Sequence, residues 1–473
     1  MSSPQTHSFI SLNASDKEPL YRQIYHRFQS AITDRLLKPG DRIPAARALA
    51  AELGLARGTV EAAYTLLIAE GYVETRGQAG TVVTPGLQPR APIPQVLPPA
   101  SQDNAIQGFY QPTLLPFQMG LPALDAFPRK IWARLTARSV RAMQATDMIY
   151  PQAAGSDPLR IAIAQYVQFS RGINCSPAQV FVTSGYRSTL ELIVRALLKP
   201  GDSAWVEQPG YPPTNELLSR AGMTLAPVPV DQEGILVAHG IKVAPRAKLA
   251  VVTPAHQSSL CMSLSLQRRF ALLDWAVRAK AWIVEDDYDG EYRYVSRPLP
   301  ALKSLDRDGR VLYAGTFSKV LFPAIRLAYL IVPEEQVEHF NKVNLAFSSA
   351  SPALTQAVVN DFITEGHFAR HIQRMRRLYG ERRQMAADGL SHVLGKHLSI
   401  DPQPGGMHLI LRMRGKRTDR ALAQRIREHG MSALALSDRS AGEDMRSALL
   451  LGFTNIDSRQ TAEALGRRIL SLL

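Results

Sequence analysis

The residue whose surroundings suggest chemistry most directly is Lys319. It ends the run Thr316-Phe317-Ser318-Lys319 after an apolar segment, and Arg326 follows seven residues later. A single lysine after a strand is usually a solvated surface charge. Two hydroxyls and an arginine, however, are suited to hold a phosphate while a lysine amine forms a Schiff base. The spacing therefore indicates a phosphate site beside a reactive lysine.

A second cluster is strongly acidic. The run Glu285-Asp286-Asp287-Tyr288-Asp289 carries four carboxylates and directly follows the apolar residues 281–284. Carboxylates at the end of a buried strand are costly unless a positive group binds there. A metal ion is one candidate, but no histidine lies nearby as a further ligand. We therefore expect a positive partner and predict no metal site.

A third cluster suits an anion. The run Val182-Thr183-Ser184-Gly185-Tyr186 ends an apolar segment and precedes a helix expected over 188–198. The first backbone N–H groups of a helix lack partners within the helix and attract anions. These residues are therefore expected to bind an anionic group at a helix N-terminus.

Short apolar runs separated by helical patterns must position these clusters. Strands alternating with helices predict an α/β domain with a largely parallel sheet, beginning near Leu114. Ligands of such sheets bind at the carboxyl ends of the strands, where the polar clusters fall. The predicted strands cover 180–182, 203–206, 249–252, 281–284 and 310–313.

The N-terminal segment has a different pattern. Apolar residues recur at helical spacing over 19–37, including Leu36, and again over 45–53 and 57–70, with Gly54 between the last two segments. Two short helices joined at a glycine form a helix-turn-helix. Residues 72–75 and 81–83 read as two strands around the tip 76–80. The pattern predicts a winged helix-turn-helix domain.

Within this domain the start of the third helix is expected to enter the major groove of DNA. Arg57 would bind a guanine or a phosphate there, and Thr59 would contact base edges. Arg47 and Arg76, with Gly77 at the wing tip, would contact the flanking phosphates. Each arginine alone is most simply a solvated surface charge, so the combined pattern carries the prediction.

The composition is that of a soluble protein with more than one domain. The chain has 473 residues, of which 45% are hydrophobic and 20% charged. No apolar stretch approaches the roughly 20 residues of a membrane span. The first residues lack a secretory signal, and Cys175 and Cys261 cannot form a disulfide framework. We expect a cytoplasmic protein without membrane contact.

The net charge of +14 suggests nucleic acid as a partner, but its distribution is uneven. Up to Pro85, nine Lys/Arg face eight Asp/Glu, so that segment contributes only +1. A proline-rich stretch follows, typical of an extended spacer. The expected organisation is a DNA-binding domain over 1–85, a linker over 86–113 and an α/β domain over 114–473.

Four motifs of the N-terminal domain resemble the GntR family of winged-helix regulators. They are Pro-Leu-Tyr-Arg-Gln-Ile, Pro-Gly-Asp-Arg-Ile-Pro, Arg-Gly-Thr-Val-Glu-Ala-Ala-Tyr and Glu-Gly-Tyr-Val, and they span most of residues 17–84. The resemblance implies an operator in double-stranded DNA as the partner. Ala46 and Ala56 stand where the family often has serine, so weaker phosphate contacts are expected at both positions.

The three polar clusters resemble the fold type I enzymes that use pyridoxal 5'-phosphate (PLP), the aminotransferase superfamily. The resemblance implies that Lys319 forms the Schiff base, that Asp286 keeps the pyridine nitrogen protonated, with Asp287 as the alternative, and that Tyr288 donates to the ring oxygen. Tyr211 would stack on the ring or cover the site. The other cofactor contacts, mostly to the phosphate, would come from Ser184, Gly185, Tyr186, Thr316, Ser318 and Arg326.

Together the two domains resemble the MocR subfamily of GntR regulators, which residues 285–294 and 366–377 also support. The segment 253–261 departs from the usual Pro-Thr-Gly. Within it, His256 is either a ring contact or a structural hydrogen-bonding residue. The arginine-rich helix over 370–383 is expected to be a solvated or DNA-facing surface.

The resemblance implies a homodimeric regulator. Its aminotransferase-like domain would sense an amino acid, an amine or a B6 vitamer, and so alter operator binding. An effector carboxylate needs an arginine, for which Arg446, just before a late strand, is the candidate and Arg412 the alternative. The alternative function is a competent aminotransferase with an accessory DNA-binding domain, since Lys319 serves both.

Overall fold

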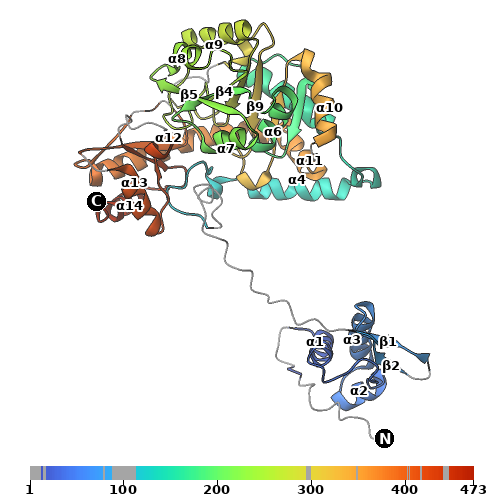
Figure 1. Cartoon of the computed structure of the whole chain (residues 1–473). Helices are drawn as coiled ribbons and strands as arrows, with labels where there is room; N and C mark the ends of the chain where they lie inside the picture. Colours follow the sequence, from blue (N-terminus) through green and yellow to red (C-terminus); the bar gives the residue numbers. More distant parts are fainter. Residues whose placement is uncertain are drawn as a thin grey trace. The chain divides into compact units, whose positions relative to one another are not determined.

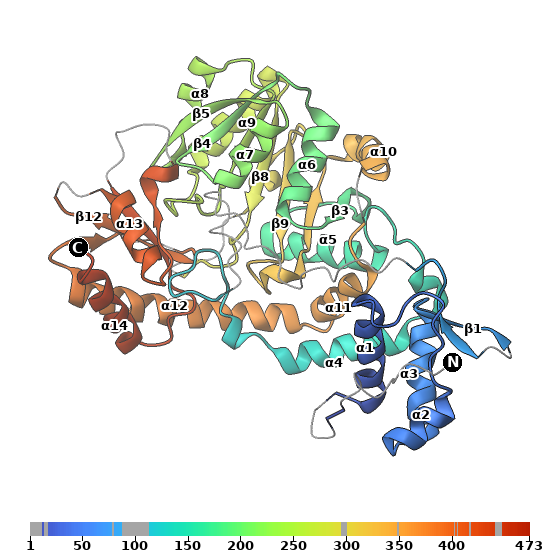
Figure 2. The same cartoon turned by 60° about the horizontal axis from the view of Figure 1, so that its bottom comes forward.

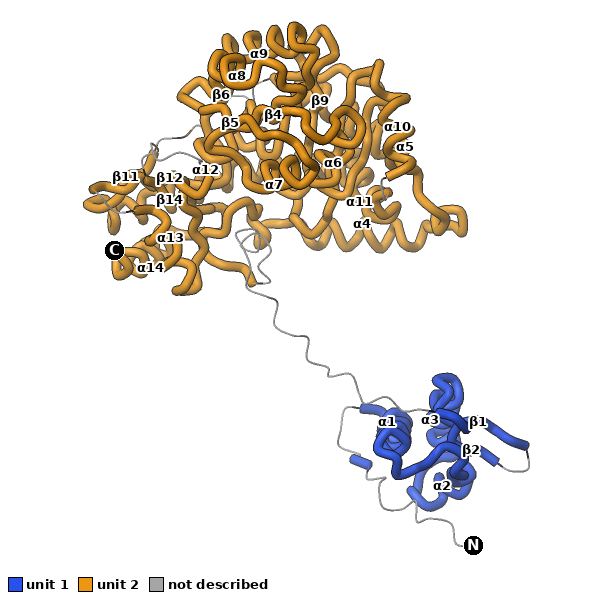
Figure 3. The backbone as a smooth tube through the Cα atoms, viewed as in Figure 1, with its two compact units in different colours: residues 1–103 blue, residues 104–473 orange. Residues whose placement is uncertain are grey.

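The computed structural model describes residues 12–13, 18–77, 80–87, 113–294, 300–347, 350–401, 403, 405–415, 418–439 and 447–473. The chain divides into two compact units, residues 1–103 and 104–473 (Figure 3). Residues 88–112, most of the predicted linker, lie outside the described residues. The predicted domain boundaries therefore stay predictions.

The first unit consists of three helices and a β-hairpin (Figure 1). The helices are α1 (Leu20–Thr33), α2 (Ala46–Leu53) and α3 (Arg57–Ala69), and the antiparallel strands are β1 (Val73–Thr75) and β2 (Thr81–Val83). Gly54 ends α2 in the left-handed region, at φ 66°, which a glycine adopts without strain. The predicted winged helix-turn-helix is confirmed.

The first helix is shorter than the sequence pattern predicted. It ends at Thr33, and Arg35 then reverses the chain at φ 61°. As a result Leu36 is 65% exposed, whereas Leu37 is buried in the core of the unit. The prediction that residues 34–37 continue the helix was wrong, because apolar spacing alone does not register a left-handed residue.

The second unit is built on a sheet with strand order β3-β10-β9-β8-β7-β4-β5-β6 (Figures 1 and 2). Strands β9, β8, β7, β4 and β5 are parallel, whereas β10 is antiparallel to both of its neighbours. The predicted, largely parallel sheet is confirmed. Its strands are β3 (Val180–Thr183), β4 (Ser203–Gln208), β5 (Thr224–Asp231), β6 (Gly234–Ile235), β7 (Leu249–Val252), β8 (Trp282–Asp287), β9 (Val311–Thr316) and β10 (Ala328–Ile331).

Helices cover both faces of this sheet. Along β9, Leu312 and Ala314 pack with α6 (Tyr186–Leu197) and α10 (Val337–Phe347). Val311 and Tyr313 point to the other face, because side chains alternate along a strand. There they pack in the clusters formed with α9 (Leu266–Ala279), α5 (Asp157–Arg171) and α11 (Ala353–Thr364). The remaining helices around the sheet are α4 (Arg129–Ala142), α7 (Pro212–Arg220) and α8 (Val237–Val243).

A smaller antiparallel sheet completes the second unit, with strand order β11-β12-β14-β13. The long helix α12 (His367–Leu394) runs from the large sheet to the small one (Figure 2). The backbone N–H of Gly452, at the end of β14, donates to the carbonyl oxygen of Phe117 and so holds this chain segment against the small sheet. The small sheet comprises β11 (Leu398–Ile400), β12 (His408–Met413), β13 (Leu434–Ala435) and β14 (Ala448–Gly452), packed with α13 (Asp419–Glu428) and α14 (Arg459–Leu470). Within the described part of the chain, no helix has the length and apolar character needed to cross a membrane.

One buried histidine should make stability depend on pH. His371 of α12 contacts the segment after β9, with Nε2 2.9 Å from the carbonyl oxygen of Val320, and burial lowers the pKa of this histidine to about 4. Below pH 6.5 the unfolded chain therefore gains a proton that the folded chain does not bind. The free energy of unfolding should fall as the pH decreases from 6.5 to 4.

His371→Gln keeps an N–H donor but does not titrate, so it should flatten this decrease by up to about 3 kcal/mol. Urea unfolding at a series of pH values measures the effect. Burial also lowers the pKa of His408 to about 4, so the free energy of unfolding of His371→Gln should still decrease somewhat as the pH falls. An identical pH dependence in wild type and His371→Gln would contradict the prediction.

Candidate functional site

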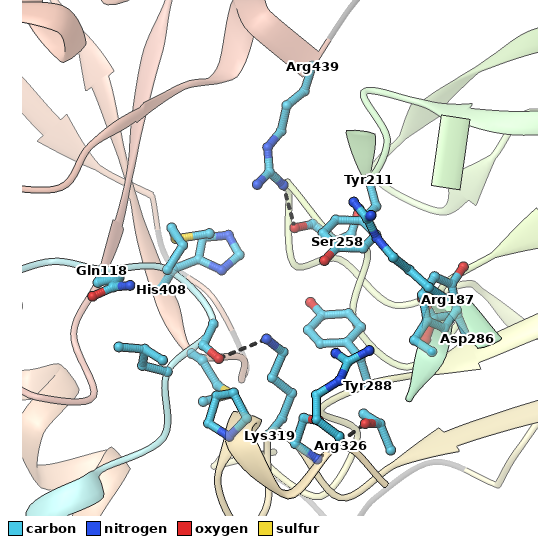
Figure 4. Close-up of a pocket in the computed structure, with 18 residues that line it drawn as sticks. Gln118, Arg187, Tyr211, Ser258, Asp286, Tyr288, Lys319, Arg326, His408 and Arg439 are labelled. Carbon is cyan, nitrogen blue, oxygen red and sulfur yellow. Dashed lines mark hydrogen bonds between the residues drawn. The ribbon is translucent and has the colours of Figure 1, made fainter. Parts of the chain in front are cut away.

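A cavity lies where the three polar clusters of the large unit meet (Figure 4). It opens at the carboxyl ends of β8 and β9 and at the start of α6, and the small sheet contributes Met407 and His408. Parallel strands bring these distant segments to one edge of the sheet. The sequence-predicted residues that line the cavity are Tyr186, Tyr211, Asp286, Tyr288, Thr316, Ser318, Lys319 and Arg326.

Lys319 extends into this cavity from the loop after β9. Its Nζ donates to the carbonyl oxygen of Gly120 at 2.8 Å. Gly120 has φ 70°, and a Cβ there would lie 2.5 Å from Nζ, so the glycine leaves room for the lysine. Burial lowers the pKa of Lys319, against the opposing effect of Asp289 and Asp286. A lowered pKa increases the fraction of neutral amine, which is the nucleophilic form.

The two neighbouring aspartates of β8 point to opposite faces of the sheet. Asp286 lines the cavity, and burial followed by the charges of Asp287 and Glu207 raises its pKa well above the usual value. No cation of the described residues forms an ion pair with it. Asp287 instead pairs with Arg171 at 2.6 Å and accepts from the Tyr313 hydroxyl at 2.6 Å. Of the two carboxylates considered for the ring nitrogen, only Asp286 faces the cavity.

Arg171 is the positive partner that the acidic run requires. It is 3% exposed, forms a second ion pair with Glu291 at 3.1 Å, and donates through Nη1 to the carbonyl oxygen of Gly290. Glu285 accepts the backbone N–H groups of Leu302 and Lys303, while burial and Asp287 raise its pKa to about 7. These contacts anchor the chain on both sides of Asp286. Among the described residues, no group of three His, Cys, Asp or Glu side chains is arranged to hold a metal ion.

An anion-binding corner forms where α6 begins. Gly185 has φ 109°, and a Cβ there would lie 3.3 Å from the Arg326 guanidinium, so this arginine faces the first turn of the helix. Ser184 itself does not line the cavity; its Oγ lies 3.3 Å from Ser351 Oγ. Thr316 Oγ1 accepts the backbone N–H of Ser318. The corner thus combines an arginine, helix N–H groups and hydroxyls.

Aromatic residues form one wall. The rings of Tyr186 and Tyr211 meet edge to face, with centroids 6.1 Å apart, and the Tyr186 hydroxyl lies 2.8 Å from Thr214 Oγ1. The Tyr288 hydroxyl is buried and has no hydrogen-bond partner within the described structure. Burying a hydroxyl without a hydrogen bond costs free energy, which suggests that a ligand oxygen accepts the hydrogen bond of Tyr288.

Two other predicted residues, His256 and Arg412, do not line the cavity. His256 is 1% exposed, and its Nδ1 lies 3.1 Å from Asp289 Oδ1. Its Nε2 faces Gly405, where a Cβ would lie only 2.4 Å away. Arg412 pairs with Asp401 at 2.8 Å on β12. Arg446 lies outside the described residues.

The structure adds an arginine that the sequence analysis missed. Arg439 is buried at the cavity wall, where its Nη1 donates to the carbonyl oxygen of Ser258 and to Ser259 Oγ. No carboxylate of the described residues pairs with it, and burial lowers its pKa. Ser258 Oγ is also buried and without a partner. The available sequence signal was the apolar run 433–436, which ends just before Arg439.

The predicted DNA-contacting residues lie on three elements of the first unit. Exposed Arg57 opens α3 and pairs with Glu61 at 2.7 Å, and Arg76 pairs with Glu74 in the hairpin. Ala56 precedes α3 and provides no side-chain cap, so the first N–H groups of α3 lack a side-chain acceptor. The remaining predicted contacts are Arg47 on α2, Thr59 in the first turn of α3, and Gly77 at the hairpin, with φ 48°.

Each of the two units matches a known protein family. Residues 119–451 match the family described as aminotransferase class I and II, and residues 20–83 match the bacterial regulatory proteins of the gntR family. The α-aminoadipate aminotransferase LysN of Thermus thermophilus, solved with N-(5'-phosphopyridoxyl)-L-leucine, superposes with a TM-score of 0.70 at 26% identity, over 78% of this chain and 95% of that chain. A kynurenine aminotransferase of Pyrococcus horikoshii, 23% identical over 78% of this chain and 92% of its own, has a TM-score of 0.69 and supports the fold.

Similarity to known regulators extends over both units of the chain. The "Probable rhizopine catabolism regulatory protein MocR" of Rhizobium meliloti is 35% identical over 94% of this chain and 92% of its own length. The pyridoxine biosynthesis transcriptional regulator PdxR of Corynebacterium glutamicum is 31% identical over 95% of both chains. Fold and relatives define a DNA-binding transcriptional regulator with a fold type I aminotransferase domain. The chain belongs to the MocR-like regulators of the GntR family.

The two aspartates of β8 should affect stability differently in the protein freed of ligands. Asp287→Asn breaks a buried ion pair and should lower the free energy of unfolding by about 3 kcal/mol. Asp286→Asn removes a buried carboxylate that has no cation partner, so stability should stay the same or rise. Urea unfolding of the large unit compares the variants. Equal losses would contradict this distinction.

Proposed function

We propose that the second unit of this regulator holds PLP and uses it to sense an effector that carries an amino group. The observation that carries the proposal is the convergence of Lys319, Asp286, Tyr288 and Arg326 on one cavity, with buried Arg439 at its wall. Occupation of the cavity would change the affinity of the first unit for its operator, as a ligand that favours one of two arrangements does.

The cavity residues fit PLP chemically. When bound, PLP supplies an aldehyde that condenses with amines and a ring that withdraws electrons. Burial, followed by the charges of Asp287 and Glu207, raises the pKa of Asp286, and a protonated ring nitrogen would supply an opposite charge and lower this pKa. The unpaired Tyr288 hydroxyl would donate to the ring oxygen. Lys319 would provide the amine for covalent attachment, and Tyr211 would cover the ring.

The anion-binding corner would hold the phosphate. Arg326 would contribute a charge-assisted bond, and the N–H groups that open α6 would add the interaction expected at a helix N-terminus. Gly185 keeps this corner open, because a Cβ there would crowd the guanidinium. The other proposed contacts are the hydroxyls of Ser184, Thr316 and Ser318 and the backbone of Tyr186. His256, behind the cavity, would position Asp289 through the contact between their side chains.

Arg439 is the arginine proposed to bind an effector carboxylate, in place of Arg446 and Arg412. It lies at the cavity, is buried, and bonds only to neutral oxygens among the described residues. A buried guanidinium without a counter-ion favours a carboxylate, which it binds in a planar, bidentate geometry. The effector class that fits both Lys319 and Arg439 is an amino acid.

Two further features concern partners. Arg47, Arg57, Thr59, Arg76 and Gly77 are proposed to contact operator DNA, with Arg57 exchanging Glu61 for a base or a phosphate. A cytoplasmic location is proposed with it, as expected for a regulator that binds operator DNA. Consecutive apolar side chains at 148–150, which are 72%, 70% and 99% exposed, form a patch that a second copy of the chain would cover in a homodimer.

The cofactor proposal predicts a coloured protein. Protein purified with PLP should absorb in the visible range, and borohydride should fix the cofactor on the peptide that contains Lys319. Lys319→Ala should lose both properties, because no other lysine lines the cavity among the described residues. Lys303→Met is the control: burial also lowers the pKa of Lys303, but it bonds to Val311 away from the cavity. Attachment that survives Lys319→Ala would refute the assignment.

The effector proposal predicts that Arg439→Gln selectively loses affinity for effectors that carry a carboxylate. Amino acids should bind roughly 10- to 100-fold more weakly, the effect of losing a charge-assisted bond. Amines that lack the carboxylate should bind unchanged. Spectral titration of the PLP-loaded protein with a panel of amino acids and their decarboxylated amines measures both, and Arg412→Gln is the control. Equal losses for acids and amines would contradict this role, and sustained turnover with a keto acid would favour an aminotransferase.

A further inference from the structure

A basic surface lies on two helices of the second unit, away from the cavity. It comprises five residues of α4 and two of α12, all exposed, and we name it the α4–α12 surface. Its members are Arg129, Lys130, Arg134, Arg138, Arg141, Arg370 and Arg374.

The α4–α12 surface is continuous across the two helices. Arg134 Nη2 lies 3.4 Å from His367 Nε2, and Arg370 Nη2 lies 2.9 Å from Nδ1 of the same histidine. Arg374 donates to the carbonyl oxygen of Ala126, just before α4 begins. Helices α4 and α12 accordingly lie along one side of the unit in Figure 2.

Carboxylates neutralise little of this charge. Asp361 and Glu365 both pair with Arg138, and Glu365 also lies 3.3 Å from His367. Arg129, Arg370 and Arg374 donate to backbone carbonyl oxygens, which leave the positive charge uncompensated. No carboxylate within the described residues pairs with the other cations of the surface.

Helix stability alone does not explain these residues. Elsewhere in the unit, several exposed helical arginines pair with a glutamate four residues away, as in Arg195–Glu191 and Arg459–Glu463. Helix α4 contains no acidic residue, and Arg129 and Lys130 occupy its first turn. Cations there oppose the helix dipole at a cost of about 0.3–1 kcal/mol each. An external anion that binds the surface would account for this cost.

The spacing of the cations fits a polyanion. Lys130, Arg134, Arg138 and Arg141 follow one another at intervals of three or four residues, so they form one stripe about 16 Å long at 1.5 Å per residue. Duplex DNA carries about one phosphate charge per 1.7 Å of its axis. The chain has a net charge of +14, of which residues 1–85 contribute only +1. We infer that the α4–α12 surface binds the phosphate backbone of DNA, as a sequence-independent contact beyond the winged helix.

The experiment uses the full-length protein and random-sequence duplex DNA, titrated at several salt concentrations by fluorescence anisotropy. The test variant combines Lys130→Gln, Arg134→Gln and Arg141→Gln. The control combines Lys242→Gln, Arg246→Gln and Arg278→Gln, which removes equal charge from exposed positions around α8 and α9. Surface changes of this kind alter stability by about 0.5 kcal/mol at most, and thermal unfolding verifies that both variants fold.

The slope of log K against log salt should fall by about 0.9 for each DNA phosphate that the protein no longer neutralises, hence by about 3 in the test variant, and remain near wild type in the control. Arg141→Gln alone should lower it by about 1. Hydroxyl-radical footprints on an operator should lose flanking protection only in the test variant. Equal slopes in the test and control variants would overturn the inference. Unchanged DNA binding with impaired transcriptional regulation would overturn it as well and assign the surface to an acidic protein.

Discussion

The large unit depends on how it accommodates adjacent carboxylates at the end of a buried strand. Side-chain alternation along β8 turns Asp286 to the cavity and Asp287 to the opposite face, where Arg171 neutralises it. The buried ion pair between Asp287 and Arg171 stabilises the end of the strand. This stabilisation offsets the cost of burying the neighbouring carboxylate of Asp286 without a cation. A raised pKa at Asp286 and a lowered pKa at Lys319 follow from the same burial. The chemistry of the cavity is therefore a consequence of where charge is neutralised and where it is not.

Local patterns in the sequence were sufficient for the architecture. Short apolar runs that alternate with helical patterns predicted buried parallel strands, because the strands of a sheet covered by helices on both faces are apolar along their length. Helical periodicity with Gly54 predicted the helix-turn-helix for a comparable reason. The error at Leu36 arose where one left-handed residue, Arg35, shifted the face that the following residues present. The spacing of apolar residues indicates which face of a whole segment is buried. It does not reveal a single residue at which the backbone changes direction.

Partners from distant parts of the chain could not be predicted in this way. Arg171 ends a helix far from Asp287 in sequence, and nothing in its local pattern indicates burial. Arg439 was missed for a related reason: an arginine was expected just before the late strand β14, whereas the cavity receives one from the turn after the two-residue strand β13. The choice between Asp286 and Asp287 likewise required the register of β8, since a shift by one residue exchanges their faces.

The cavity and the surface of the unit present two forms of uncompensated charge. Inside, Asp286 and Arg439 are buried without counter-ions among the described residues. In the proposed function, the cofactor would supply the partner of Asp286 and the effector that of Arg439, and both ligands would stabilise the folded unit by mass action. Outside, the cations of α4 remain in water, where lack of pairing costs little and attraction to a polyanion depends on salt. Because they are buried, the charges of the cavity select small molecules of defined geometry. Because they are exposed, the cations of α4 can bind DNA of any sequence. A regulator needs both properties, because its effector must be discriminated and its DNA must be found.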